Sequence, residues 1–102
     1  MPAVFTLAVR PDLILLTNAS ATGAAVPVPG GVYVWGVDGT WTGATAQLQW
    51  RRGSSRPWID LDGFSVTADG GFNNVPLARG EVRVTITGGT SPSLSSQLGG
   101  IA

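Results

Sequence analysis

Two segments of the chain alternate between apolar and polar side chains, which is the pattern of a strand with one buried face. In residues 81–87, valine and isoleucine occupy every second position, with glutamate, arginine and threonine between them. Residues 44–50 repeat the pattern, with alanine, leucine and tryptophan on one side and threonine and glutamine on the other. The residues predicted to face the core are Ala44, Ala46, Leu48, Trp50, Val82, Val84 and Ile86.

Shorter apolar runs between glycine- and aspartate-rich turns predict further strands. Residues 12–20 fit a short helical turn, but residues 13–16 within them fit a fully buried strand equally well. The total is about eight or nine strands, spaced about 10 residues apart, without the helical stretches that connect parallel strands. Predicted turns, where glycine and aspartate tolerate positive φ, cover 29–31, 38–39, 52–55, 62–63, 69–71 and 87–89. The other predicted strands cover 4–9, 25–28, 32–37, 58–61, 64–67, 72–77 and 93–98.

The predicted fold is all-β, a single antiparallel β-sandwich of about eight strands that is either jelly-roll or immunoglobulin-like. The number of strands does not by itself separate these from a partly open barrel. A length of 102 residues allows one domain. Within it, residues 31–102 form the predicted sandwich, and residues 1–30 form an N-terminal arm or edge segment.

Residues 32–37 depart from the alternating pattern because both faces of the predicted strand are apolar. Val32 and Val34 lie on one face, and Tyr33 and Trp35 lie on the other. One interpretation is a central strand whose second face is covered by the N-terminal segment. The other is that one face meets another subunit, since exposed aromatic patches mark interfaces.

Composition narrows the functions that are open to the chain. Six arginines balance six acidic residues, and charged residues make up 12% of the chain, against about 25% in a typical soluble domain. This balance argues against nonspecific binding to nucleic acid or to an anionic membrane, and so little surface charge favours association with other proteins.

Cysteine, histidine and lysine are absent, which excludes disulfides, thiolate and Ser-His catalysis, and Schiff bases. We therefore predict a non-enzymatic protein without a cofactor.

The sequence also gives no indication of a membrane-spanning helix or a signal peptide. No apolar run approaches the about 20 residues of a membrane-spanning helix. The N-terminal residues lack the basic region and apolar core of a signal peptide. Synthesis in a cytoplasm is expected.

The acidic residues do not form a convincing reaction centre. Asp60, Asp62 and Asp69 suggest calcium, but no glutamate closes a calcium-binding loop, and Asp-Gly is also a common turn signal. Glu81 is the one acid outside the turns, and it shares an outward strand face with Arg83. Neither a metal site nor a pair of glycosidase carboxylates is predicted.

Two features are candidates for contact with a partner. The loop at 51–57 carries Arg51, Arg52 and Arg56, whose guanidinium groups could dock on an acidic protein surface. A solubilising hairpin end explains the same residues, whereas three arginines without a wider basic field disfavour phosphate or nucleic acid. Trp41 lies in a glycine- and threonine-rich loop, where its ring could stack on a sugar or enter a partner's pocket.

Four segments between residues 40 and 90 together resemble a known group of proteins. The relevant segments are GATAQLQW at 43–50, WIDL at 58–61, VTADG at 66–70 and GEVRVTITGG at 80–89. They are similar to small β-rich structural proteins of tailed bacteriophages. The resemblance implies a virion component, and we expect a decoration or cement protein that binds the outer capsid surface and stabilises neighbouring capsid subunits.

The resemblance also implies partners and a location. The expected partner is the major capsid protein or another virion protein, and a homo-oligomer is expected, with a trimer suited to a local three-fold axis. The chain would lie on the capsid surface after synthesis in the host cytoplasm. Residues 2–9 could extend as an arm that adds a strand to a neighbour. The expected contact residues are Tyr33, Trp35 and Trp41 as apolar anchors and Arg51, Arg52 and Arg56 as charged contacts.

A carbohydrate-binding or adhesion module of a phage tail or head appendage is the main alternative. In it, Trp41 and Tyr33 would be stacking platforms, and Asp38 or Asp60 would accept hydrogen bonds from sugar hydroxyls. An immunoglobulin-like domain with a purely architectural role is a third interpretation.

Overall fold

The computed structural model describes residues 12–101, which form eight β-strands without a helix. The prediction of an all-β chain is confirmed. No helix in this part of the chain is long and apolar enough to cross a membrane. The strands are β1 (Leu13–Ala19), β2 (Val26–Val28), β3 (Gly31–Thr40), β4 (Ala44–Arg51), β5 (Ile59–Val66), β6 (Gly70–Leu77), β7 (Gly80–Gly88) and β8 (Ser93–Gly100).

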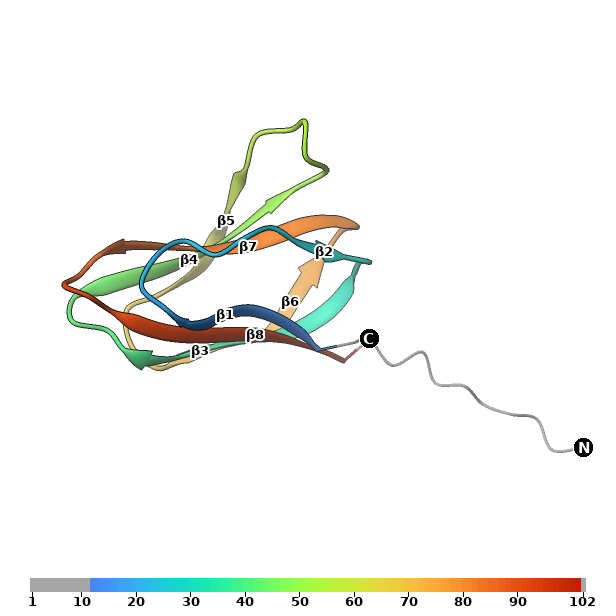
Figure 1. Cartoon of the computed structure of the whole chain (residues 1–102). Helices are drawn as coiled ribbons and strands as arrows, with labels where there is room; N and C mark the ends of the chain where they lie inside the picture. The colour runs from blue at the N-terminus through green and yellow to red at the C-terminus, as the bar shows by residue number, and fades with distance from the viewer. Residues whose placement is uncertain (1–11, 102) are drawn as a thin grey trace, which may run out of the picture.

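The strands form two antiparallel sheets of four, stacked as two layers (Figure 1). Sheet A has the order β1-β8-β3-β6, and sheet B has the order β2-β7-β4-β5. The pairs β4 with β5, β3 with β6, β2 with β7 and β1 with β8 are nested, so the chain is one long hairpin. This hairpin is rolled until β3 also pairs with β8, and β4 with β7. Such an order is that of a jelly roll, and it decides between the two sandwich types that the sequence left open.

The two alternating segments lie side by side in the middle of sheet B, as β4 and β7. Ala46, Leu48, Val82 and Val84 have no exposed surface. The register sets Leu48 opposite Val84, so the apolar faces coincide and cover the core together. Both predictions are confirmed.

Two predicted turns are wrong. The strands predicted on either side of Asp62 and Gly63 are one strand, β5, whose register against β4 shifts at this point. The turn predicted at Asp38 and Gly39 lies inside β3, and the chain turns at 41–43 instead. Gly63 and Gly39 do have positive φ, of 83° and 140°. A glycine with positive φ, however, occurs at an irregularity within a strand as readily as in a turn.

Residues 12–20, which fit either a helical turn or a buried strand, contain β1 at one edge of sheet A. Leu15 and Leu16 are buried, whereas Ile14 is 62% exposed. The segment is therefore a strand, but it is not fully buried.

The segment predicted as an N-terminal arm or edge, residues 1–30, supplies edge strands to both sheets through β1 and β2. Val28 of β2 belongs to the core. Residues 12–30 are therefore part of the sandwich. The strand predicted at 4–9 and the extension predicted for 2–9 lie outside the described residues.

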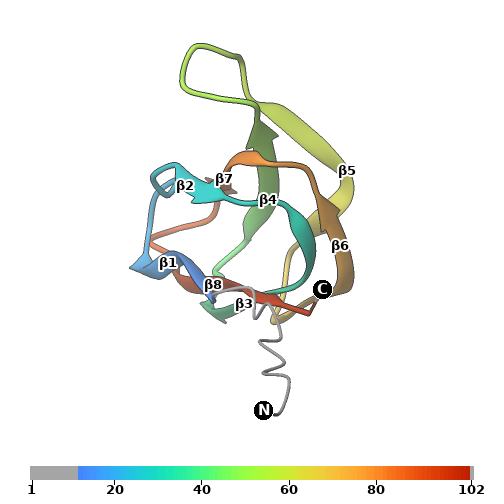
Figure 2. The ribbon, with the colours of Figure 1, turned by 90° about the vertical axis from the view of Figure 1, so that its right-hand side faces the viewer.

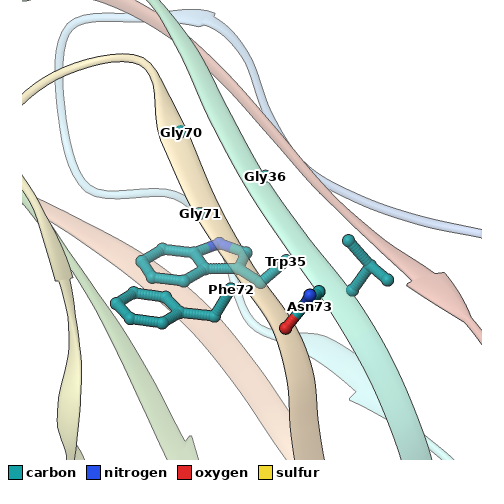
Figure 3. Close-up of a pocket in the computed structure, with 7 residues that line it drawn as sticks. Trp35, Gly36, Gly70, Gly71, Phe72 and Asn73 are labelled. Atoms are coloured by element: carbon teal, nitrogen blue, oxygen red, sulfur yellow. The ribbon is translucent and has the colours of Figure 1, made fainter.

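The core contains a row of aromatic rings that joins the two sheets. Trp35 of β3 stacks on Phe72 of β6, with ring centroids 5.9 Å apart and an interplanar angle of 7° (Figure 3). Phe72 meets the edge of Phe64 at 5.1 Å. Because Phe64 lies on β5 in sheet B, the row connects the layers where β5 and β6 form their edges.

The buried polar groups of the core are paired. The Trp35 indole N–H donates to Ser96 Oγ at 2.9 Å, and the Ser96 hydroxyl donates to the Gly36 carbonyl oxygen at 2.8 Å. Within residues 12–101, no buried side-chain nitrogen or oxygen lacks a hydrogen-bond partner. This chain of two bonds connects β3 with β8 inside the core.

Replacement of Ser96 tests this connection. Ser96→Ala leaves the Trp35 indole N–H buried without an acceptor, so we expect the free energy of unfolding to fall by about 1–3 kcal/mol. Ser65→Ala, on an exposed position of β5, is the control and should change it by no more than about 0.5 kcal/mol. Urea unfolding followed by tryptophan fluorescence measures both, and equal stability of the two variants would contradict the assignment.

Candidate functional site

Two of the predicted contact residues lie in the core. Tyr33 and Trp35 have no exposed surface, so the prediction that they anchor a partner is wrong. The aromatic face of β3 points inward, where the Tyr33 hydroxyl donates to the Gly30 carbonyl oxygen at 3.0 Å. The outward face is the valine side, on which Val34 is 40% exposed. That side is the one available to another subunit.

Trp41 is half-buried against the core at the start of the β3–β4 turn. Its indole N–H donates to Asp69 Oδ1 at 2.8 Å, and the Gly39 backbone N–H donates to the same oxygen at 3.0 Å. Asp69 belongs to the β5–β6 turn, so Trp41 helps to tie two turns together. Because Tyr33 is buried, the pair of stacking platforms required by the carbohydrate alternative does not form.

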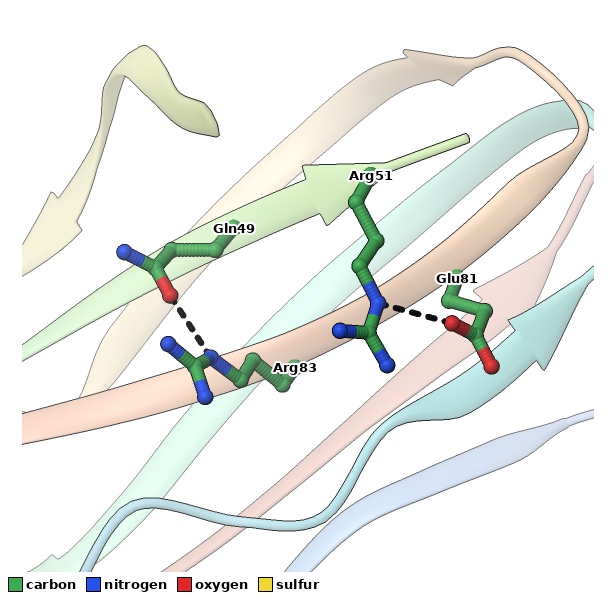
Figure 4. A network of polar contacts seen from close by, with 4 residues as sticks. All are labelled: Gln49, Arg51, Glu81 and Arg83. Carbon is green, nitrogen blue, oxygen red and sulfur yellow. Dashed lines mark hydrogen bonds and ion pairs between the residues drawn. The ribbon is translucent and has the colours of Figure 1, made fainter. Parts of the chain in front are cut away.

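Arg51 is engaged on the outer face of sheet B. Its Nε–H donates to a carboxylate oxygen of Glu81 at 2.7 Å, directly across the β4–β7 register (Figure 4). Its guanidinium also lies 4.3 Å from the centre of the Trp58 ring. The Arg83 guanidinium lies 4.4 Å from the same centre, and its Nε–H donates to Gln49 Oε1 at 2.7 Å. Arg51 thus packs this face and is not a free contact residue.

Arg52 and Arg56 lie on a loop that projects from the sandwich. Residues 52–58, here called the arm, join β4 to β5 and stand away from both sheets in two perpendicular views (Figures 1 and 2). Both arginines are exposed, and neither forms an ion pair within residues 12–101. An open hollow of about 310 Å³ lies between the arm and the ends of β4 and β5. The hollow is lined by Trp50, Arg52, Arg56, Pro57 and Ile59.

The arm is fixed at its base and within its own turn. On the β4 side, the Trp50 indole N–H donates to the Ala78 carbonyl oxygen at 3.0 Å. On the β5 side, the Trp58 ring lies under the two guanidinium groups described above. Between them, the Arg56 backbone N–H donates to the Gly53 carbonyl oxygen at 3.0 Å. These contacts restrict the positions that the arm can adopt.

The outer face of sheet A is a second candidate surface. Ile14, Gln97, Gly36 and Gly71 form one row across its four strands. A hollow of about 450 Å³ runs along β3 and β6, over a stretch where glycines leave the backbone bare (Figure 3). Gly71 is required there, because a Cβ at this position would collide with the Trp35 carbonyl oxygen. The face therefore combines isolated aliphatic side chains with exposed backbone.

The two candidate surfaces differ in charge. The five arginines within residues 12–101 lie on the arm, on β4 and β7, and at Arg79 in the β6–β7 turn, and none lies on a strand of sheet A. Asp38 is exposed on the outer side of β3. The arm is therefore the basic surface of the described chain, and sheet A has an outer face without basic side chains.

The carboxylates considered for calcium do not converge. Asp60 accepts a hydrogen bond from Gln49 Nε2 at 2.6 Å, and Asp69 is bound to Trp41. In the described part of the chain, no three histidine, cysteine, aspartate or glutamate side chains are grouped to hold a metal ion.

Sequence reasoning missed the apolar lining of the arm hollow. The sequence pattern predicts Trp50 as a core or hairpin-packing residue, and it places Ile59 in a strand without assigning it a face. Ile59 is 52% exposed, and it follows the arm directly. The available signal was the run of proline, tryptophan and isoleucine at 57–59 immediately after an arginine, but the register shift inside β5 decides which of these side chains face outward.

Comparisons of the chain with known protein families, with curated proteins and with solved structures found no match.

Removal of the Trp58 ring tests whether it holds the arm in place. Trp58→Ala removes the surface beneath both guanidinium groups, so we expect faster backbone motion for residues 52–57 while the sandwich stays folded. Trp58→Phe retains a ring and should keep the arm close to its original order. Heteronuclear NOE values of the backbone amides measure this motion, and unchanged values in Trp58→Ala would refute the anchoring role.

Proposed function

We propose that the protein is a non-enzymatic structural component of a phage virion, a cement or decoration protein on the outer capsid surface. In this role it binds the major capsid protein or another virion protein and stabilises neighbouring capsid subunits. Self-association, with a trimer at a local three-fold axis, is part of the proposal. The resemblance of residues 40–90 supplies the virion context, and the arm supplies the main structural support.

The support from the arm lies in its exposure. The arm projects from the sandwich (Figure 1). The apolar hollow at its base is lined in part by Arg52 and Arg56, which are exposed and form no ion pair within residues 12–101. A solvated hairpin end needs charge but does not need Trp50, Pro57 and Ile59 beside it. Arginine and tryptophan are the residues that concentrate binding energy at protein interfaces. This combination therefore favours protein docking over a purely solubilising role.

The second surface suits a clamp, which has to touch more than one neighbour. The outer face of sheet A is separate from the arm and carries exposed aliphatic residues at Ile14 and Val34. Apolar area removed from water contributes about 25 cal/mol per Å². Burial across a junction between capsid subunits would raise the free energy needed to separate them, and many copies on one particle would make modest contacts sufficient.

The fold agrees with this role without deciding it. Jelly rolls occur in viral capsid domains and also in lectins, and a fold alone does not assign a function. The lectin-like alternative depended on Tyr33 and Trp41 as exposed platforms. One of these side chains is buried and the other is hydrogen-bonded to Asp69, so the geometry favours the docking role.

Counting the chain in purified particles tests the proposal. Trypsin cleaves after Arg52 and Arg79, and the bond before Pro57 resists it, so residues 53–79 are released as one internal peptide for isotope-dilution mass spectrometry. The major capsid protein in the same digest is the internal reference. We expect copy numbers of the same order as the capsid subunits, and particles lacking the chain should release their genome at a lower temperature.

Two other results of the copy-number measurement would contradict the proposal. A handful of copies per particle would contradict the cement role and point to a tail or spike. Absence from the particle would contradict the virion assignment as a whole.

A further inference from the structure

The arm hollow combines two kinds of binding group. Trp50, Pro57 and Ile59 give it an apolar lining, and Arg52 and Arg56, the two exposed arginines of the arm, line the same hollow. Its volume of about 310 Å³ is at the lower end of the range of small-ligand pockets, about 300–1,000 Å³. A space of this size accepts one aliphatic side chain with its flanking groups.

The charge around the hollow selects the chemistry of the occupant. Arg52 and Arg56 are exposed and without an ion pair in the described chain. Arginine binds carboxylates through paired N–H donors, and such charge-assisted bonds are stronger than neutral ones. The acid nearest in sequence to the lining, Asp60, already accepts a hydrogen bond from Gln49. As far as the described residues are concerned, the two guanidinium groups are thus free for carboxylates of another molecule.

A protein carboxylate fits the whole surface better than a phosphate polymer does. The chain has no net charge, and nucleic-acid affinity depends on neutralising many phosphates at once. Arg51 and Arg83, the neighbouring cations, are engaged with Glu81 and Gln49. Two free arginines beside an apolar hollow match a short acidic peptide with an apolar residue.

The arm is also ordered before binding. Trp50 and Trp58 fix its two ends, and a turn hydrogen bond closes it. A binding site that is already in place loses less conformational entropy when the ligand arrives. A short peptide can therefore bind measurably on its own.

We propose that the arm hollow binds an acidic peptide segment of a partner protein, with an aliphatic side chain in the hollow and flanking carboxylates on Arg52 and Arg56. This inference rests on the proposed docking function and names the chemistry of the partner surface. It also assigns separate roles to the two arginines and to the apolar lining.

Peptide titration followed by NMR tests the inference on the full chain. The probe is the capped tripeptide Asp-Leu-Asp, added to ¹⁵N-labelled protein. We expect saturable shifts of the arm amides, the Trp50 indole and the arginine Nε–H groups, with a Kd on the order of 1 mM for so small a ligand. The capped peptides Lys-Leu-Lys and Asp-Ser-Asp, which lack the charge and the apolar side chain, should bind at least about tenfold more weakly.

Matched variants locate the contact. Arg52→Gln and Arg56→Gln should each weaken binding of Asp-Leu-Asp by about tenfold. Arg79→Gln removes an exposed arginine that does not line the hollow and should leave binding unchanged. The dispersed amide spectrum of each variant shows whether the sandwich is intact.

Several results would overturn the inference. These are no saturable shift with Asp-Leu-Asp, equal binding of the three peptides, shifts confined to sheet A, or displacement of the peptide by an equal concentration of inorganic phosphate. Each of these results would contradict the acidic-peptide site, whatever the number of copies of the chain per particle. The copy number tests the virion role alone, so the two proposals fail separately.

Discussion

The inner face of β3 is the constraint on which the rest of the structure depends. This strand lies between β8 and β6 in sheet A and carries Tyr33, Trp35 and Val37 into the space between the sheets. The Trp35 ring can be buried there because Phe72 stacks on it and Ser96 accepts its N–H. Both partners come from strands far along the chain, so β6 and β8 must return to β3. That requirement favours the rolled order of the whole sandwich.

The arm depends on the sandwich in turn. Its base is the outer face of sheet B, where Arg51 and Arg83 lie over Trp58. Each of these arginines is itself held by a neighbour across the β4–β7 register, through Glu81 or Gln49 (Figure 4). A regular pair of strands therefore supports the projecting loop. Arg52 and Arg56 of the arm, by contrast, form no ion pair within residues 12–101.

The alternating segments were predictable because strict alternation in β4 and β7 has one physical explanation, a sheet with one buried face. The faces of β3 were harder to assign, since both are apolar. Only the fold shows that Tyr33 and Trp35 point inward and Val34 outward. The sequence pattern also could not show that Gly63 lies inside a strand, because a positive φ serves turns and irregular strands alike.

The candidate site was predictable in its charge but not in its shape. The density of arginines at 51–56 pointed to the arm, yet Arg51 differs from Arg52 and Arg56 because cross-strand pairing sets it opposite Glu81. The hollow requires Trp50 and Ile59 to meet across the ends of β4 and β5, a relation that the register establishes. Contacts between strands thus decided what local sequence left open.

Electron cryo-microscopy of the assembled particle would show directly whether this chain joins neighbouring capsid subunits through its arm, as we propose. We expect density for the jelly roll on the outer surface, with Arg52 and Arg56 against acidic side chains of a subunit. We also expect the outer face of sheet A, or another face of the same copy, to contact a second subunit. An arm that points into solvent, or a chain that touches a single subunit, would contradict the proposed role.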